Sequence, residues 1–216
     1  MNIIFDLDGT IIDSLPGIRS SLVYAMRQQG HVIDEFIDIS MLIGPPMNTV
    51  VSSLLTPYND DRVIETVNIY REHYSMHGVY QATLYDGIKM ALGELKDKNH
   101  RLFIATSKRQ RFAEIILTNL KLRSLFTDVI GTQEDGSLDD KSLLLSALIH
   151  KHNLNIKNTI MIGDRKDDII SAHKNGVFSI GVLWGYGSSE ELSLHNAGIK
   201  CRSPLQLNDV IEKSPL

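Results

Sequence analysis

Two aspartates, Asp6 and Asp8, follow directly after the apolar residues 3–5 near the start of the chain. On chain that is leaving a strand, both carboxylates can point into one crevice, and Gly9 lets the backbone turn back sharply. Two bare carboxylates in one crevice repel each other, which pushes one of them toward protonation. A divalent cation would remove this repulsion and attract an anionic substrate. The alternative is an ordinary Asp-Gly turn with Asp6 as a cap.

A second group of acidic residues comprises Asp164, Asp167 and Asp168, directly after the apolar run 159–162. Carboxylate oxygens are hard ligands that suit Mg²⁺, which keeps several waters and takes only a few carboxylates. Aspartates also favour the first turn of a helix because of its dipole. That alternative is plausible for Asp167 and less so for Asp164.

Two weaker signals could bind an anion. Thr106 and Ser107 follow the apolar run 101–105, and a hydroxyl with backbone N–H groups at a helix start can hold a phosphate. Both residue types are also common helix caps. Lys141 opens a predicted helix, where a cation is unfavourable against the helix dipole and therefore has another reason to be there. Taken alone, a solvated surface lysine is the simpler interpretation.

The elements that position these residues alternate along most of the chain. Short apolar runs predict buried strands, and amphipathic stretches between them predict helices. The predicted strands are 3–5, 101–105, 128–130, 159–162 and 178–183, and the predicted helices are 86–99, 108–120, 140–153 and 167–175. This order predicts an α/β fold, a three-layer, doubly wound parallel sheet with helices on both faces. Ligands bind such sheets beyond the carboxyl ends of the strands, where the candidate residues fall.

One region breaks the alternation. Residues 14–82 contain helical periodicity and no good strand candidate, with long helices predicted over 16–29 and 60–77. We therefore predict a core domain made of residues 1–13 and 83–216, with an all-helical cap domain inserted at 14–82.

Composition excludes several classes of protein. The chain has 216 residues, of which 43% are hydrophobic, so it can bury a core and is not intrinsically disordered. Its net charge of −4 argues against a nucleic-acid partner. No apolar run approaches the roughly 20 residues of a membrane span. The single cysteine, Cys201, cannot form an internal disulfide and suits a reducing compartment. We expect a cytoplasmic protein, a monomer or a weak homodimer.

In combination, the candidate residues resemble the four motifs of the haloacid dehalogenase superfamily of phosphohydrolases. The matching residues are Asp6 to Thr10 for the first motif, Thr106 for the second, Lys141 for the third, and Gly163 and Asp164 with Asp168 for the fourth. The resemblance covers nearly the whole chain.

The segment 14–82 looks like the small helical cap of the superfamily's phosphoglycolate-phosphatase-like members. Its turn at Gly44 and Pro45 is similar to their substrate-contacting cap loop. The resemblance thus narrows the expected subgroup.

The resemblance implies a role for each residue. Asp6 would attack phosphorus to form an aspartyl-phosphate, and Asp8 would act as general acid and base. Mg²⁺ would be held by Asp6, Asp164 and the main-chain carbonyl of Asp8. The remaining implied residues are Gly9, Thr10, Thr106, Ser107 and Lys141, which would bind the substrate phosphate, and Asp167 and Asp168, which would support the site.

The function expected from this resemblance is a Mg²⁺-dependent phosphatase acting on a small phosphorylated metabolite, either a phosphoglycolate-like compound or a nucleoside monophosphate. A phosphosugar mutase and a pyrophosphatase of the same superfamily stay open. A different class of protein, a receiver-like phospho-acceptor or a binding domain, also combines acidic residues with Thr and Lys. The helical insertion and Asp8 argue against that class, because a signalling domain needs neither a lid nor rapid dephosphorylation.

Overall fold

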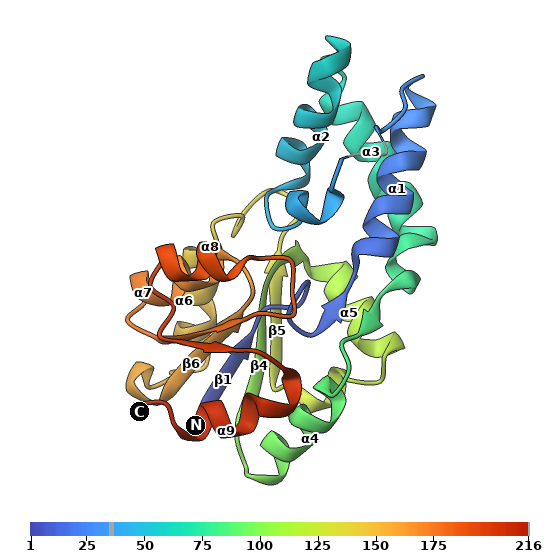
Figure 1. Ribbon diagram of the computed structural model, residues 1–216. Helices are drawn as coiled ribbons and strands as arrows, with labels where there is room; N and C mark the ends of the chain where they lie inside the picture. Colours follow the sequence, from blue (N-terminus) through green and yellow to red (C-terminus); the bar gives the residue numbers. More distant parts are fainter. Residues whose placement is uncertain (35–36, 216) are drawn as a thin grey trace. The chain divides into compact units, whose positions relative to one another are not determined.

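The computed structural model describes residues 1–34 and 37–215 and divides the chain into two compact units. The core unit joins Met1–Asp13 to Leu84–Leu216, and the helical unit is Ser14–Thr83 (Figure 1). Residues 35, 36 and 216 belong to the predicted domain ranges but lie outside the described residues. Two short strands, β2 (Ile12–Asp13) and β3 (Thr83–Leu84), stand where the chain passes from one unit to the other.

Six parallel strands of the described core unit form one sheet. They are β1 (Asn2–Phe5), β4 (Arg101–Arg109), β5 (Asp128–Thr132), β6 (Thr159–Gly163), β7 (Phe178–Val182) and β8 (Ile199–Cys201). Their order is β5-β4-β1-β6-β7-β8. The chain builds outward from β1 first through β4 and β5, and then on the other side through β6, β7 and β8. The predicted α/β fold with a doubly wound parallel sheet is confirmed.

Helices cover both faces of this sheet. They are α4 (Ile88–Asp97), α5 (Gln110–Asn119), α6 (Lys141–Lys151), α7 (Lys166–Lys174), α8 (Ser189–Leu194) and α9 (Leu207–Glu212), with short 3₁₀ helices at Arg123–Leu125, Ile156–Asn158 and Pro204–Gln206. Figure 1 shows α6 and α7 on one side of the strands and α4 and α5 on the other. Strands covered on both faces must be apolar throughout, and all four residues of β1 are buried.

The α6–α7 face has a continuous apolar core. Ile4, Phe103 and Met161 project from three neighbouring strands into a cluster with Leu144 and Leu148 of α6. Each of these side chains is fully buried or nearly so, which stabilises each by about 1.5–3 kcal/mol relative to an exposed one. The core therefore fixes the strand ends that carry the candidate site.

The sequence predicted a helix from residue 108, but β4 continues through Arg109 and α5 begins at Gln110. The pairing of β4 with β5 shifts register between Thr106 and Arg109. The Gln110 carboxamide fills the gap in the ladder: its Nε2 donates to the Val129 carbonyl at 2.9 Å, and its Oε1 accepts from the Gly131 N–H at 2.6 Å. A side chain that pairs with the backbone of β5 thus holds the irregular end of β4 in the sheet.

The helical unit contains α1 (Leu15–Gln28), α2 (Met47–Leu55), α3 (Val63–Met76) and 3₁₀ helices at Ile39–Leu42, Thr56–Tyr58 and Gly78–Gln81. The start of α1 approaches the 3₁₀ helix Gly78–Gln81, which follows α3, so closely that a Cβ on Gly17 would lie 2.0 Å from the Gly78 carbonyl oxygen. His31, after α1, contacts the Asp60 carboxylate at 2.6 Å before α3. Within the described residues, no helix has the length and apolar character that a membrane span requires.

Candidate active site

The register of the sheet brings three strand ends together. Phe5, the last residue of β1, pairs with Ile104 of β4 on one side and with Ile162 of β6 on the other. The next residues along these neighbouring strands therefore lie side by side, and they lead to Asp6 after β1, to Thr106 within β4 and to Asp164 after β6. This is the point where the strand order reverses direction, which is where doubly wound sheets bind ligands.

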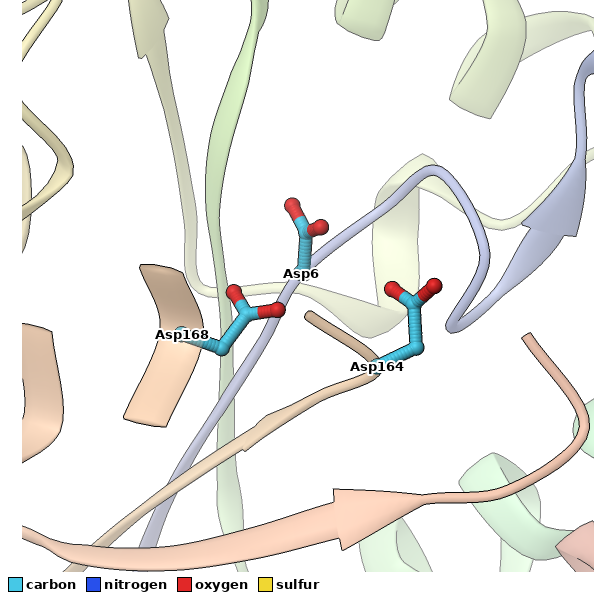
Figure 2. Close-up of side chains that lie close together, drawn as sticks. All are labelled: Asp6, Asp164 and Asp168. Atoms are coloured by element: carbon cyan, nitrogen blue, oxygen red, sulfur yellow. The ribbon is translucent and has the colours of Figure 1, made fainter. Parts of the chain in front are cut away.

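Three buried carboxylates converge at this edge. Asp6 follows β1, Asp164 follows β6 and Asp168 lies on α7, and one oxygen from each lies within 4.8 Å of the others. Figure 2 shows the three side chains turned to the same side of the strand ends. Asp164 and Asp168 are fully buried, and Asp6 is 6% exposed. Three carboxylates that lie this close together and are buried away from water carry a high electrostatic cost unless cations compensate for their charge.

Lys141, the first residue of α6, supplies one such cation. Its Nζ lies 2.9 Å from Asp6 Oδ1 and 2.5 Å from Asp168 Oδ1, and the residue is 8% exposed. Burial by itself would lower the pKa of Lys141, but the charges of Asp168 and Asp6 outweigh burial and raise the pKa above its ordinary value. Lys141 is therefore charged at every physiological pH, and the alternative of a solvated surface lysine is wrong.

Asp164 is held by the backbone around it. Its Oδ1 accepts from the Thr10 hydroxyl at 3.3 Å, and its Oδ2 accepts from the Tyr186 N–H at 2.7 Å. Gly9 has a φ of +80°, and a Cβ there would lie 2.2 Å from Asp164 Oδ2, so no larger residue fits beside this carboxylate. Burial, followed by the charges of Asp168 and Asp6, raises the pKa of Asp164 to about 8.

Asp168 connects the carboxylates to α7. Its Oδ2 accepts from the Arg165 N–H at 3.0 Å at the start of this helix, while Oδ1 faces Lys141. A Cβ on Gly163 would lie 2.0 Å from Asp168 Cγ, so glycine is needed for the close approach. Burial raises the pKa of Asp168 to about 7, although Lys141 acts in the opposite direction.

The donor set fits a divalent cation. Asp6, Asp164 and Asp168 bring three carboxylates against the single positive charge of Lys141, and the raised pKa values of Asp164 and Asp168 reflect burial together with mutual repulsion. Hard carboxylate oxygens at this spacing suit Mg²⁺. A bound dication would compensate for the remaining negative charge. The acidic cluster could therefore hold a metal ion.

Asp8 lies in a separate ion pair. Both of its carboxylate oxygens accept hydrogen bonds from Lys108 Nζ, at 3.0 and 2.9 Å, and the Lys108 side chain is only 6% exposed. The Lys108 N–H donates to Thr106 Oγ1 at 3.2 Å, so the irregular end of β4 links the threonine to Asp8 through one residue. The sequence did not single out Lys108; the available signal was a lysine two residues beyond Thr106.

The geometry agrees with the comparison to known families. The family model of haloacid dehalogenase-like hydrolases matches residues 3–182, which include Asp6, Thr106, Lys141, Asp164 and Asp168. The chain belongs to the haloacid dehalogenase-like hydrolase family. The superfamily predicted from the sequence motifs is therefore confirmed, as is the expectation of an enzyme that hydrolyses phosphomonoesters.

Several proteins of this family are similar over nearly the whole chain. A 5'-nucleotidase of Pseudomonas aeruginosa is 35% identical over 213 residues, which cover 98% of this chain and 95% of the relative. A phosphoglycolate phosphatase of Aliivibrio fischeri is 30% identical, covering 88% of this chain and 87% of the relative. A crystal structure of a predicted phosphatase from Clostridium acetobutylicum superposes with a TM-score of 0.90 at 34% identity, covering 99% and 98% of the two chains.

The remaining predicted residues are less closely tied to the carboxylates. Ser107 accepts from the Thr132 hydroxyl through its carbonyl oxygen at 3.2 Å, within the β4–β5 ladder. Asp167 is half-buried in the first turn of α7 and outside the group of three carboxylates. Gly44 and Pro45 belong to the helical unit, in the turn between Ile39–Leu42 and α2. Their roles stay predictions.

Proposed function

We propose that this haloacid dehalogenase-like hydrolase cleaves small phosphomonoesters with Mg²⁺ as cofactor and Asp6 as the nucleophile. The observation that carries the proposal is the buried group of Asp6, Asp164 and Asp168 around Lys141. Lys141 holds one Asp6 oxygen at 2.9 Å, which fixes the orientation of that carboxylate at the end of β1. A carboxylate that is fixed in orientation and shielded from water is suited to attack a phosphoryl group, provided that nearby cations neutralise the phosphoryl oxygens. Lys141 and the proposed Mg²⁺ would be those cations.

The reaction then proceeds in two displacements. An Asp6 oxygen forms a bond to phosphorus while the bond from phosphorus to the substrate oxygen breaks. Asp8, which has to enter this step protonated on one of the oxygens that otherwise accept from Lys108, donates the proton that this leaving oxygen needs. Asp8 next takes a proton from a water molecule, which attacks phosphorus and releases the Asp6 carboxylate with inorganic phosphate. Proton transfer of this kind contributes roughly 10²–10⁴-fold to a rate.

Other residues of the core unit would hold the phosphoryl oxygens. Lys141 and the Thr106 hydroxyl supply a charge and a donor, and the Ser107 backbone would supply an N–H group. Gly9 and Thr10 would line the phosphate site, because their own N–H groups already donate to the Ile12 and Leu7 carbonyl oxygens. Mg²⁺, held by Asp6, Asp164 and the Asp8 carbonyl, would polarise the phosphoryl group and screen it from the attacking carboxylate. Asp168 supports the site by pairing with Lys141, and Asp167 lies in the same turn of α7.

The substrate class is proposed from the relatives. The Pseudomonas aeruginosa relative named 5'-nucleotidase is 35% identical over 98% of this chain, so a nucleoside 5'-monophosphate is the first substrate to test. Phosphoglycolate is the second, because of the relative named for that activity.

We further propose that the helical unit is a cap that excludes water during transfer, with Gly44 and Pro45 contacting the substrate. It is a compact unit inserted soon after Asp8 in the chain. The free, buried thiol of Cys201 is consistent with a cytoplasmic enzyme. Sedimentation would test the predicted monomer or weak homodimer.

The test is phosphate release by the Asp6→Asn variant. We expect this variant to fold normally and to lose Mg²⁺-dependent hydrolysis of a generic aryl phosphate, because the amide cannot form the acyl phosphate. Asp97→Asn, at the exposed end of α4, is the matched control and should retain full activity. Wild-type activity in Asp6→Asn would refute the mechanism.

A substrate panel separates the remaining alternatives. Release of phosphate from nucleoside 5'-monophosphates or phosphoglycolate supports the proposal. Preferential hydrolysis of pyrophosphate, or transfer of phosphate between positions of a sugar, would replace it with the pyrophosphatase or the mutase. A phosphorylated protein that persists for hours would indicate a receiver-like acceptor instead.

A further inference from the structure

Tyr186 connects three parts of the core unit that are far apart in sequence. Its N–H donates to Asp164 Oδ2 at 2.7 Å, and its hydroxyl donates to Asp13 Oδ1 at 2.9 Å. Its side chain is also hydrogen-bonded to that of Tyr85. Tyr186, in the loop that follows β7, therefore contacts a carboxylate of the candidate metal site through its backbone N–H. Its phenol contacts two further residues, Asp13 and Tyr85.

Asp13 and Tyr85 lie at the two passages, the short segments 12–14 and 84–86 at which the chain crosses between the core unit and the helical unit. The first segment of the core unit ends at Asp13, and the second begins at Leu84, one residue before Tyr85. Any movement of the helical unit must be accommodated by the chain at these two passages. The Tyr186 side chain is hydrogen-bonded to Asp13 at the first passage and to Tyr85 at the second, while its backbone N–H is hydrogen-bonded to Asp164.

The loop that carries Tyr186 is packed too tightly to absorb such a movement by itself. A Cβ on Gly185 would lie 2.2 Å from the Gly9 carbonyl oxygen, and a Cβ on Gly187 would lie 1.8 Å from the Asp164 carbonyl oxygen. The Trp184 indole N–H donates to the Thr10 carbonyl at 3.0 Å. The loop thus packs against Asp164 and against Gly9 and Thr10, so a displacement of the Tyr186 phenol is transmitted to its backbone.

We propose that Tyr186 is a positioning residue that couples the attachment of the helical unit to the orientation of Asp164. This inference rests on the proposed Mg²⁺ site and extends it. When Mg²⁺ binds Asp164, the Tyr186 N–H is fixed together with the carboxylate, and the phenol then holds Asp13 and Tyr85 more firmly. The metal ion thereby rigidifies both passages as well as the site itself, because energetic coupling is reciprocal between linked sites.

The experiment is amide hydrogen exchange of the whole chain with and without Mg²⁺. In the wild type, we expect Mg²⁺ to slow exchange in residues 6–10 and also in residues 12–14 and 84–86, by roughly fivefold at the passages, the change that one hydrogen bond produces. Tyr186→Phe keeps the backbone bond to Asp164 and loses the phenol bonds. Protection by Mg²⁺ should therefore persist at residues 6–10 and disappear at the two passages.

Two variants of Asp13 serve as matched controls. Asp13→Asn keeps an acceptor oxygen for the Tyr186 hydroxyl and should retain protection at the passages, whereas Asp13→Ala should lose it. Loss of passage protection in Tyr186→Phe and Asp13→Ala alone supports the coupling. Equal protection in all four proteins, or no protection at the wild-type passages although Mg²⁺ protects residues 6–10, would overturn it. If Mg²⁺ protects no part of the wild type, the proposed metal site itself has failed.

Discussion

Replacing Lys141 with methionine removes the cation between two buried carboxylates while keeping the length of the side chain. Lys141 is 8% exposed and lies 2.9 Å from Asp6 and 2.5 Å from Asp168. Removing one partner of a buried ion pair costs about 3–5 kcal/mol, because an uncompensated charge is left behind. For a chain of this length, we expect the melting temperature in EDTA to fall by roughly 10 °C.

The assays are urea unfolding at pH 8 in EDTA, which gives the unfolding free energy, and a thermal melt in the same buffer, both followed by circular dichroism. Lys151→Met is the matched control, because Lys151 lies on the same helix with a side chain that is 60% exposed and pairs with Asp128 at the surface. A surface pair contributes about 0–1 kcal/mol, so this control should change the unfolding free energy little.

A second substitution tests the cause of the loss. Asp168→Asn in the Lys141→Met background removes one of the carboxylates left without a cation, and it should restore part of the lost stability. Mg²⁺ should also restore part, by binding the folded state alone. If Lys141→Met were as stable as Lys151→Met at pH 8 in EDTA, the electrostatic account of the site would be refuted.

Two further predictions concern pH and the Asp8 ion pair. The pKa values of Asp164 and Asp168 are raised in the folded state, to about 8 and about 7, so their contribution to stability is complete below the ordinary 3.8 and lost as pH rises through the raised values. Thermal unfolding in EDTA should therefore show that stability falls between pH 5.5 and 8.5. Adding Mg²⁺ should make this fall smaller, and a stability in EDTA that does not change with pH would contradict the prediction. Lys108→Met should lower kcat for an aryl phosphate by roughly 10²-fold, because Asp8 loses the cation that aligns it. Exposed Lys89→Met is the control, and equal kcat values for the two variants would exclude this role.

One sequence pattern, an apolar run that ends at a polar residue, predicted both the strands of the sheet and the positions of the carboxylates. A parallel strand buried on both faces needs an uninterrupted apolar run, so the residue that ends the run is visible in the sequence as the first polar one. Asp6 and Asp164 stand at such positions, and the fold that brings strand ends together is confirmed.

Features that depend on pairing between distant segments could not be predicted in this way. The continuation of β4 through Arg109 depends on the Gln110 carboxamide bonding to β5, and helical periodicity in the sequence cannot show that contact. The ion pair of Lys108 with Asp8 joins residues 100 positions apart. The hydrogen bonds of Tyr186 to Asp13 and Asp164 exist only once three segments have folded together.

The helical unit is inserted in the chain between β1 and β4, two neighbouring strands of the sheet. This position has a consequence for how such enzymes diversify. Parallel neighbours such as β1 and β4 always need a crossover connection, and α4 within the core unit already provides one. Ser14–Thr83 is therefore an addition to a connection that is complete without it. Because the entropy of closing a loop grows only with the logarithm of its length, a tenfold longer connection costs about 2 kcal/mol. A lineage can thus lengthen, exchange or discard this segment while the strand order and the buried carboxylates stay the same.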